Sequence, residues 1–256
     1  MQYLTPQLTQ EVIGRLKTFE NELCEVFSRY GYDLRDNLGR RNQLVSQAQE
    51  KEFARSLRKV YKEVVEDGSP GKPDIFIVDI QKELECKLTS GSGKSKTFSL
   101  QTDWETLKNK EKLDYLYMLT TPDFEGFCVL FFKGLTTDDF FPPASGSRGK
   151  SRMNKAKAMK KCEALHGRVV NKRKIMIQKW GIRKGMTEIE KNARIAELRK
   201  ELAETENNKR RQKLMEMVVS ESRRYHNKMA LYQRKIQLWE SKEDSFTFKF
   251  EGIKNG

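Results

Sequence analysis

Histidine is nearly absent from this chain of 256 residues, which contains only His166 and His226. Both lie in basic, polar stretches of the sequence. Several hydrolytic mechanisms, the Ser-His-Asp type among them, use a histidine base, so this scarcity argues against them. Chemistry that needs no histidine is correspondingly favoured.

The chain also lacks paired cysteines. Its four cysteines, Cys24, Cys86, Cys128 and Cys162, are widely scattered, and no CxxC pair is present to hold zinc. Nothing in the sequence indicates secretion, so a disulfide framework is not expected. The cysteines are predicted to be reduced thiols that pack mostly as small hydrophobic side chains.

Long hydrophobic runs are missing as well. The longest wholly apolar run, Phe127 to Phe132, is far too short to cross a bilayer. The opening residues, MQYLTPQLTQ, have neither the basic region nor the apolar core of a signal peptide. Hydrophobic residues make up 37% of the chain and charged residues 34%, which leaves enough apolar side chains for a globular core. We expect a soluble cytoplasmic protein that does not associate with membranes.

Proline and glycine are unevenly distributed. All six prolines precede Ala144, and neither residue type occurs between Met186 and Glu251. This distribution divides the chain into a turn-rich body at 1–143, a basic segment at 144–185 and a helical segment at 186–256.

Positive charge is concentrated in the basic segment. Residues 144–185 contain 14 lysines and arginines and a single acidic residue, Glu163, whereas the remainder holds 36 basic and 35 acidic residues. So local an excess points to a polyanionic partner, and nucleic acid is the first candidate. A membrane surface fits less well, because the segment lacks a broad apolar face.

Hydrophobic periodicity predicts the elements of the body. Helices are expected over Thr9 to Tyr30 and over Gln43 to Glu66, and a third over Asp103 to Lys112 with Thr102 or Asp103 as its N-cap. The runs that predict strands are 75–78, 83–88, 113–119 and 127–132. The fold class is therefore α/β or α+β, with a sheet of at least four strands.

The last part of the chain has helical periodicity. Thr187 and Glu190 have the spacing of a capping box, which predicts a helix start. A heptad seam follows, formed by Val218, Ser222, Tyr225, Met229, Tyr232, Ile236 and Trp239. A turn at 206–208 would give an antiparallel helical hairpin, and without it one long helix would result. Alternating phenylalanines within 244–250 indicate a closing strand.

The residues best suited to catalysis lie in the predicted hairpin at 73–88. Asp74 begins its first strand, and alternation places Glu85 and Lys87 on one face of the second. Two carboxylates brought together in this way need a cation, and hard oxygen ligands suit Mg²⁺. Lys87 would orient or help to deprotonate a metal-bound water. Asp79 is an alternative acid, but it lies in the turn at the other end of the hairpin.

Pro73-Asp74 followed, eleven positions after Asp74, by Glu85-Cys86-Lys87 resembles the motif of the PD-(D/E)XK nucleases. The resemblance covers roughly 43–132. It implies a mixed β-sheet core flanked by helices that hydrolyses phosphodiester bonds, usually in DNA. It also implies that Asp74 and Glu85 hold Mg²⁺, that the backbone carbonyl of Cys86 is a further ligand, and that Lys87 is catalytic.

Some members of this family add a glutamate from the preceding helix, and Glu50 is the matching candidate. Glu50 continues the apolar stripe of Phe53, Leu57, Val60 and Val64 by one turn, an unusual place for a carboxylate. The alternative is that Glu50 simply lies beyond the edge of the core.

Two segments are candidates for DNA contact. The loop 90–96, with Lys94 and Lys96, either touches the DNA backbone or is solvated. It lacks the spacing of a phosphate-binding loop, so no nucleotide cofactor is expected. The candidates in the basic segment are Arg148, Lys150, Arg152, Asn154, Lys155, Lys157, Lys160 and Lys161. Arg148, Arg152 and Asn154 are candidate base readers, although all of these residues could instead meet only phosphates.

Three functions fit these features. The first is a Mg²⁺-dependent endonuclease that cuts double-stranded DNA, a type II restriction enzyme acting as a homodimer because one site cuts one strand per event. The second is a related nuclease, such as a junction resolvase, nicking repair enzyme or phage exonuclease. The third is a non-enzymatic DNA-binding protein with a coiled-coil tail. Asp74, Glu85 and Lys87 argue against the third, and the large basic segment favours the first.

Overall fold

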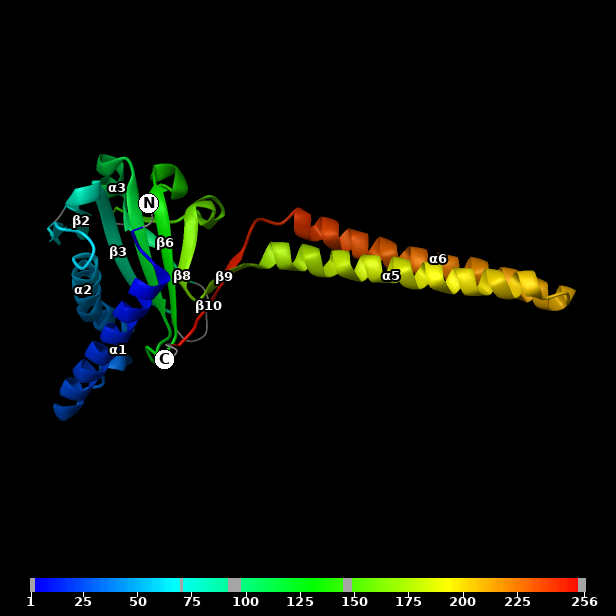
Figure 1. Ribbon diagram of the computed structural model, residues 1–256, viewed down its shortest axis with the longest axis horizontal. Coiled ribbons are helices and arrows are strands. Elements are labelled where there is room, and N and C mark those ends of the chain that lie inside the picture. The colour runs from blue at the N-terminus through cyan, green and yellow to red at the C-terminus, as the bar shows by residue number, and fades with distance from the viewer. Residues whose placement is uncertain (1–2, 70, 92–97, 145–148, 253–256) are drawn as a thin grey trace. The chain divides into compact units, whose positions relative to one another are not determined.

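A computed structural model of the chain describes residues 3–69, 71–91, 98–144 and 149–252. The chain forms two compact units, one of Met1–Val170 with Phe246–Gly256 and the other of Asn171–Ser245 (Figure 1). The residues of the basic segment are distributed over several elements of both units. The concentration of positive charge in residues 144–185 therefore does not correspond to a separate structural unit. None of the helices in the described ranges combines the length and apolar composition needed to span a membrane.

A six-stranded mixed sheet is the centre of the first unit. Its strand order is β1 (Val64–Glu66), β2 (Ile75–Ile77), β3 (Lys82–Ser90), β5 (Leu113–Thr120), β6 (Phe127–Leu135) and β8 (Cys162–His166). Strands β3 and β5 are parallel, and the other neighbouring pairs are antiparallel. The mixed α/β class expected from the sequence is therefore confirmed, and the sheet has more strands than the minimum of four.

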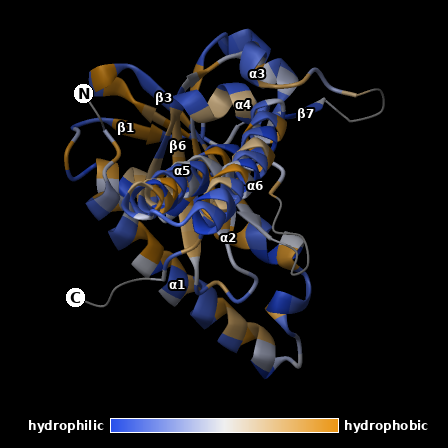
Figure 2. Cartoon of the chain, turned by 90° about the vertical axis from the view of Figure 1, so that its right-hand side faces the viewer, coloured by the Kyte–Doolittle hydropathy of each residue, from blue (hydrophilic) through white to orange (hydrophobic). Residues whose placement is uncertain are grey.

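Two helices cover one face of this sheet, α1 (Pro6–Arg29) and α2 (Leu38–Leu57) (Figure 1). The Thr5 side chain caps α1 by accepting from the backbone N–H of Leu8, and the Asn37 side chain caps α2 in the same way. Both helices are amphipathic, whereas the strands of the sheet are mostly hydrophobic (Figure 2). Leucines, valines and Phe53 from the helices form one buried cluster with β2, β3 and β5.

The second helix is shorter than the sequence predicts. It ends at Leu57, and Val64–Glu66 form the edge strand β1, with Val64 opposite Ile77 of β2. The last two residues of the predicted apolar stripe therefore do not belong to the helix. Val64 is buried in the sheet instead, and Val60 is exposed. Strand pairing and the β-branched valines at 64 and 65 outweigh the helical spacing.

The other face of the sheet carries smaller elements. These are β4 (Gln101–Asp103), α3 (Trp104–Lys110), β7 (Lys150–Arg152) and α4 (Lys155–Ala158). Strands β4 and β7 pair to form an antiparallel ribbon, and β9 (Arg168–Asn171) pairs with β10 (Phe246–Lys249), the closing strand expected from the alternating phenylalanines. Short 3-10 helices lie at Leu34–Asp36, Val78–Ile80, Thr137–Asp139 and Met159–Lys161.

The second unit is an antiparallel hairpin of α5 (Lys172–Glu204) and α6 (Asn208–Glu240). The chain turns at 205–207, so the hairpin is confirmed and the single long helix is wrong. The heptad seam of α6 faces α5, where the rings of Trp180 and Tyr232 stack 5.8 Å apart. The capping box at Thr187 is also wrong, because Asn171 caps α5 sixteen residues earlier and Thr187 is buried inside the helix. Gly181 and Gly185 are tolerated in a helix that packs along its length.

Candidate active site

The β2–β3 hairpin brings Asp74 and Glu85 together. Ile75 pairs with Leu84, so extending the antiparallel register by one residue sets Asp74 opposite Glu85. Asp74 Oδ2 accepts a hydrogen bond of 2.7 Å from the backbone N–H of Cys86. Asp79 lies at the far end of the hairpin, where its carboxylate accepts from the backbone N–H of Lys62 at 2.6 Å. Asp74 is therefore the acid that shares this site with Glu85.

Alternation along β3 separates the polar side chains from the core, as expected. Leu84 and Cys86 are buried in the cluster with α1 and α2. The Cys86 side chain therefore faces the core, and Cys86 could offer a metal ion only its backbone carbonyl oxygen. Glu85 and Lys87 point to the opposite face of the sheet. The Lys87 ammonium contacts Glu85 Oε1 directly and lies 3.9 Å from Asp74 Oδ2. One lysine therefore contacts both carboxylates.

Burial is the largest influence on the pKa values of the two acids of this hairpin. Burial raises the pKa of Asp74 and of Glu85, although Lys87 counteracts part of each rise. Burial lowers the pKa of Lys87, but the carboxylates of Glu85 and Asp74 raise it by more, so the net shift is upward. Lys87 is thus a charged ammonium at neutral pH.

Glu50 of α2 belongs to the same electrostatic environment. Its pKa is raised to about 7, mainly by burial and also by the carboxylates of Asp74 and Glu85, while Lys87 opposes the rise. Glu50 of α2 therefore lies within electrostatic range of both acids of the hairpin.

These residues fit a hard divalent cation in their chemistry. Glu85 Oε2 is buried and has no hydrogen-bond partner among the described residues. Asp74, Glu85, the Cys86 carbonyl and Glu50 supply only oxygen donors, which suit Mg²⁺. Within the described ranges, however, no three histidine, cysteine or acidic side chains are grouped closely enough to form a complete metal site.

Two tyrosines of β5 attach the ribbon beside this hairpin. In the parallel register, Tyr115 is opposite Glu85 and Tyr117 is opposite Lys87. The Tyr115 hydroxyl lies 2.7 Å from Thr102 Oγ1, and the Tyr117 hydroxyl donates to the Gln101 carbonyl at 2.9 Å. Because both tyrosines share the sheet face of Glu85 and Lys87, they fix β4 next to the acids.

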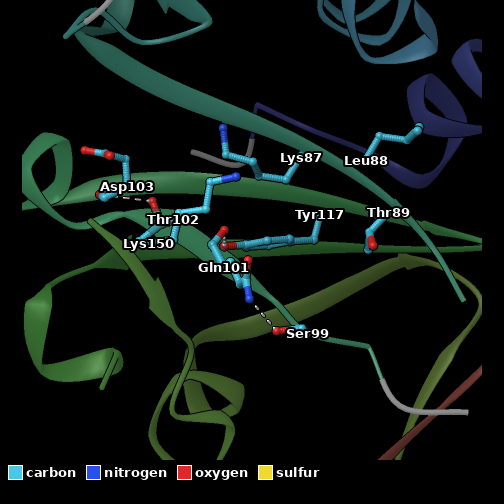
Figure 3. A pocket seen from close by; sticks show the side chains of 9 residues that line it. All are labelled: Lys87, Leu88, Thr89, Ser99, Gln101, Thr102, Asp103, Tyr117 and Lys150. Carbon is cyan, nitrogen blue, oxygen red and sulfur yellow. Dashed lines mark hydrogen bonds between the residues drawn. The ribbon is translucent and has the colours of Figure 1, made fainter. Parts of the chain in front are cut away.

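A cavity of about 380 Å³ lies between Lys87 and this ribbon (Figure 3). Lys87 and Lys150 extend into it from β3 and β7, and Asp103 lies at the same end. Asp103 also caps α3 by accepting from the Thr106 N–H at 2.9 Å. The sequence predicts Asp103 only as a helix cap, and it does not predict a role for Gln101, Tyr115 or Tyr117. Two tyrosines at alternate positions of an otherwise apolar buried strand were the available signal.

The basic candidates differ in what their side chains contact. Lys150 and Arg152 are exposed on β7, and neither forms an ion pair within the described ranges. Lys157 and Lys160 are also exposed. Arg148, Lys94 and Lys96 lie outside the described residues.

The other three candidates make local contacts. Lys155 donates to the Phe98 carbonyl at 2.6 Å, and Lys161 forms an ion pair of 2.6 Å with Asp139. The Asn154 side chain caps α4 by accepting from the Lys157 N–H. Asn154 is therefore engaged with the backbone, although the sequence suggested it as a base reader.

Comparison with protein-family models, with curated proteins and with solved structures finds no match for this chain. Its function is inferred from the chemistry of the hairpin and of the surfaces around it.

Proposed function

We propose that this protein is a Mg²⁺-dependent endonuclease that hydrolyses the phosphodiester bonds of double-stranded DNA. The observation that carries the proposal is the shared contact of Lys87 with Asp74 and Glu85 on one hairpin. Glu50 would be a third carboxyl group at this site, since burial and these same acids raise its pKa. An acid at the start of one strand and an E-x-K sequence on the next are the features that resemble PD-(D/E)XK nucleases.

Asp74 and Glu85 would hold the metal ion, with the Cys86 carbonyl and Glu50 as further oxygen donors. When bound, Mg²⁺ supplies a water of lowered pKa and positive charge for the phosphate. Lys87 is protonated, because Glu85 and Asp74 raise its pKa. Lys87 would donate hydrogen bonds to the reacting phosphate, or would orient the attacking water and help to deprotonate it.

The ribbon beside the hairpin supports nucleic acid as the substrate. Lys150 and Arg152 present unpaired positive charge there, and Lys150 lines the same cavity as Lys87. Phosphate contacts of this kind supply affinity and place the DNA strand relative to the catalytic residues. Among such nucleases, we propose a type II restriction enzyme, because the exposed basic surface is larger than a minimal nuclease needs for binding DNA.

A homodimer would cut both strands, and α5 carries a surface that supports one. The heptad seam of α6 is used by α5 within the hairpin. Ile175, Ile182, Met186 and Ile189 are nevertheless exposed on α5, at spacings of seven, four and three. At 100° per residue they form one stripe opposite the face that packs on α6. A second copy of this helix is the simplest partner for such a stripe.

Incubation of the protein with duplex plasmid and Mg²⁺, followed by fragment mapping, tests the proposal. Discrete fragments that require Mg²⁺ are expected for a restriction enzyme. A smear would favour an exonuclease of the same class instead. A gel shift without cleavage over a range of divalent ions would overturn the nuclease proposal and leave the DNA-binding protein.

A further inference from the structure

A second cavity adjoins the pocket of Lys87 and shares Gln101 and Lys150 with it. It has a volume of about 530 Å³ and is also lined by Phe141, Pro142, Ala144 and Arg152. Because two lining residues are common to both cavities, a DNA strand bound at Lys87 would lie next to the second one. The second cavity plays no part in the chemistry proposed above.

Phe141 gives this cavity an exposed aromatic ring. Its side chain is 52% exposed, whereas its neighbour Phe140 is buried in the second hydrophobic cluster. Phe140 pairs with Met153 across a β-bridge, and the Phe141 N–H donates to the Arg152 carbonyl at 2.8 Å. The backbone that leads into Phe141 is thus held by the core and by β7. An exposed aromatic ring of this kind offers a face on which a nucleobase can stack.

The polar groups around the ring complement a nucleic acid. Gln101 pairs with Arg152 across the β4–β7 ribbon, and both side chains are exposed. Within the described ranges, neither Arg152 nor Lys150 forms an ion pair, so both remain available to an anionic ligand. Arginine and glutamine form paired hydrogen bonds with base edges, and lysine binds phosphate.

We propose that this cavity binds one unstacked nucleobase of the DNA strand, with its face on Phe141, its polar edge toward Arg152 and Gln101, and its phosphate on Lys150. A base inside a duplex is stacked on both sides and cannot offer its face to a side chain. The cavity therefore selects a base that is unpaired or turned out of the helix. This inference rests on the proposed function in taking DNA as the ligand, but it needs neither the metal nor cleavage.

The test measures binding in EDTA, where metal-dependent cleavage cannot occur. A labelled duplex with one central bulged nucleotide is compared with the fully paired duplex by fluorescence anisotropy. The wild-type protein is expected to bind the bulged duplex at least about fivefold more tightly, the lower range for stacking one base on an aromatic ring. Phe141→Ala should remove this preference and leave affinity for the paired duplex unchanged, whereas Phe141→Trp should retain the preference.

A matched control is Tyr30→Ala, which removes another exposed aromatic ring of the same unit outside both cavities. This variant should keep the wild-type preference. Equal affinity of the wild-type protein for both duplexes, or no binding of either, would overturn the inference. An equal loss on both duplexes in Phe141→Ala would also overturn it. Plasmid cleavage is measured separately. Cleavage without a preference for the bulged duplex would support the proposed function and contradict the base-binding cavity. A preference for the bulged duplex without cleavage would support the cavity and contradict the nuclease.

Discussion

The Lys87 ammonium lies 3.9 Å from Asp74 Oδ2 while it contacts Glu85 Oε1 directly. Among the described residues, Lys87 is the only basic side chain in contact with both acids. If Asp74 and Glu85 held a divalent ion, they would bind Lys87 less strongly. The Lys87 ammonium would then be available to the substrate phosphate.

Asp74→Asn and Glu85→Gln should each reduce cleavage by at least about a hundredfold and change DNA affinity by less than about tenfold. Both changes preserve side-chain shape and remove the negative charge that holds a cation. Asp79→Asn is the matched control, because Asp79 lies in the same hairpin and bonds only to the backbone at its far end. Single-turnover cleavage and anisotropy separate the two effects. Unchanged cleavage in either variant would place the active site elsewhere.

Lys87→Met should lower the rate of the cleavage step far more than DNA affinity, since a charged donor to the reacting phosphate is lost. Lys82→Met provides the comparison on the same strand, where the lysine is exposed. Its rate should remain close to that of the wild-type protein. Rates under saturating protein and binding in EDTA are the two measurements. Full activity of Lys87→Met with Mg²⁺ present would remove Lys87 from the mechanism.

The pKa of Glu50 predicts how stability depends on pH. Its folded value, about 7, exceeds the ordinary 4.5, so the folded state binds this proton more tightly than the unfolded state. Stability in EDTA should therefore decrease as pH rises from about 4.5 to 7. Glu50→Gln removes that loss, and at pH 8 it should be more stable than the wild-type protein by about 1–2 kcal/mol. This is less than the full shift implies, because the carboxyl is only partly buried.

Denaturant unfolding at several pH values measures this difference. The two proteins should have similar stability near pH 4.5, and their curves should separate above it. Mg²⁺ at pH 8 should stabilise the wild-type protein more than Glu50→Gln, because a bound cation compensates the buried charge. Parallel curves at all pH values would show that Glu50 ionises as an ordinary exposed carboxyl. Glu63→Gln, an exposed acid beyond the end of α2, is the control.

The hairpin could be predicted from sequence because its determinants are local. Alternation on β3 and the position of Asp74 suffice to place the acid pair and Lys87. The end of α2 could not be predicted, since residues 64–66 are held by pairing with β2, a contact that periodicity does not reveal. The β4–β7 ribbon was missed for a similar reason. Its strands have three residues each, are far apart in sequence, and are held in place by the tyrosines of β5.

Charge alone also could not distinguish the basic residues by role. Lys150→Ala should weaken DNA binding and reduce the slope of log affinity against log salt by about 0.9, the value for one lost phosphate contact. Lys161→Ala should instead lower the melting temperature, because Lys161 is paired with Asp139. Salt titrations by anisotropy and thermal unfolding provide the two readouts. An unchanged salt slope in Lys150→Ala would mean that this lysine of the ribbon does not contact a DNA phosphate.

The exposed stripe of α5 predicts a dimer that a single charge disrupts. Ile182→Glu and Ile189→Glu place a carboxylate among side chains that are 48–71% exposed in one chain. Such changes cost little in a monomer, but in a helix-to-helix interface they bury an unpaired charge. Sedimentation velocity should show a dimer for the wild-type protein and a monomer for both variants. Circular dichroism should show unchanged helix content.

Met215→Glu is the control for this prediction, because Met215 is equally exposed but lies on α6, outside the stripe. It should remain dimeric. The monomeric variants should still bind DNA, yet on plasmid they should accumulate nicked circles before linear product, since each copy cuts one strand. A wild-type protein that sediments as a monomer while producing linear DNA directly would contradict the homodimer and require both cuts from one chain.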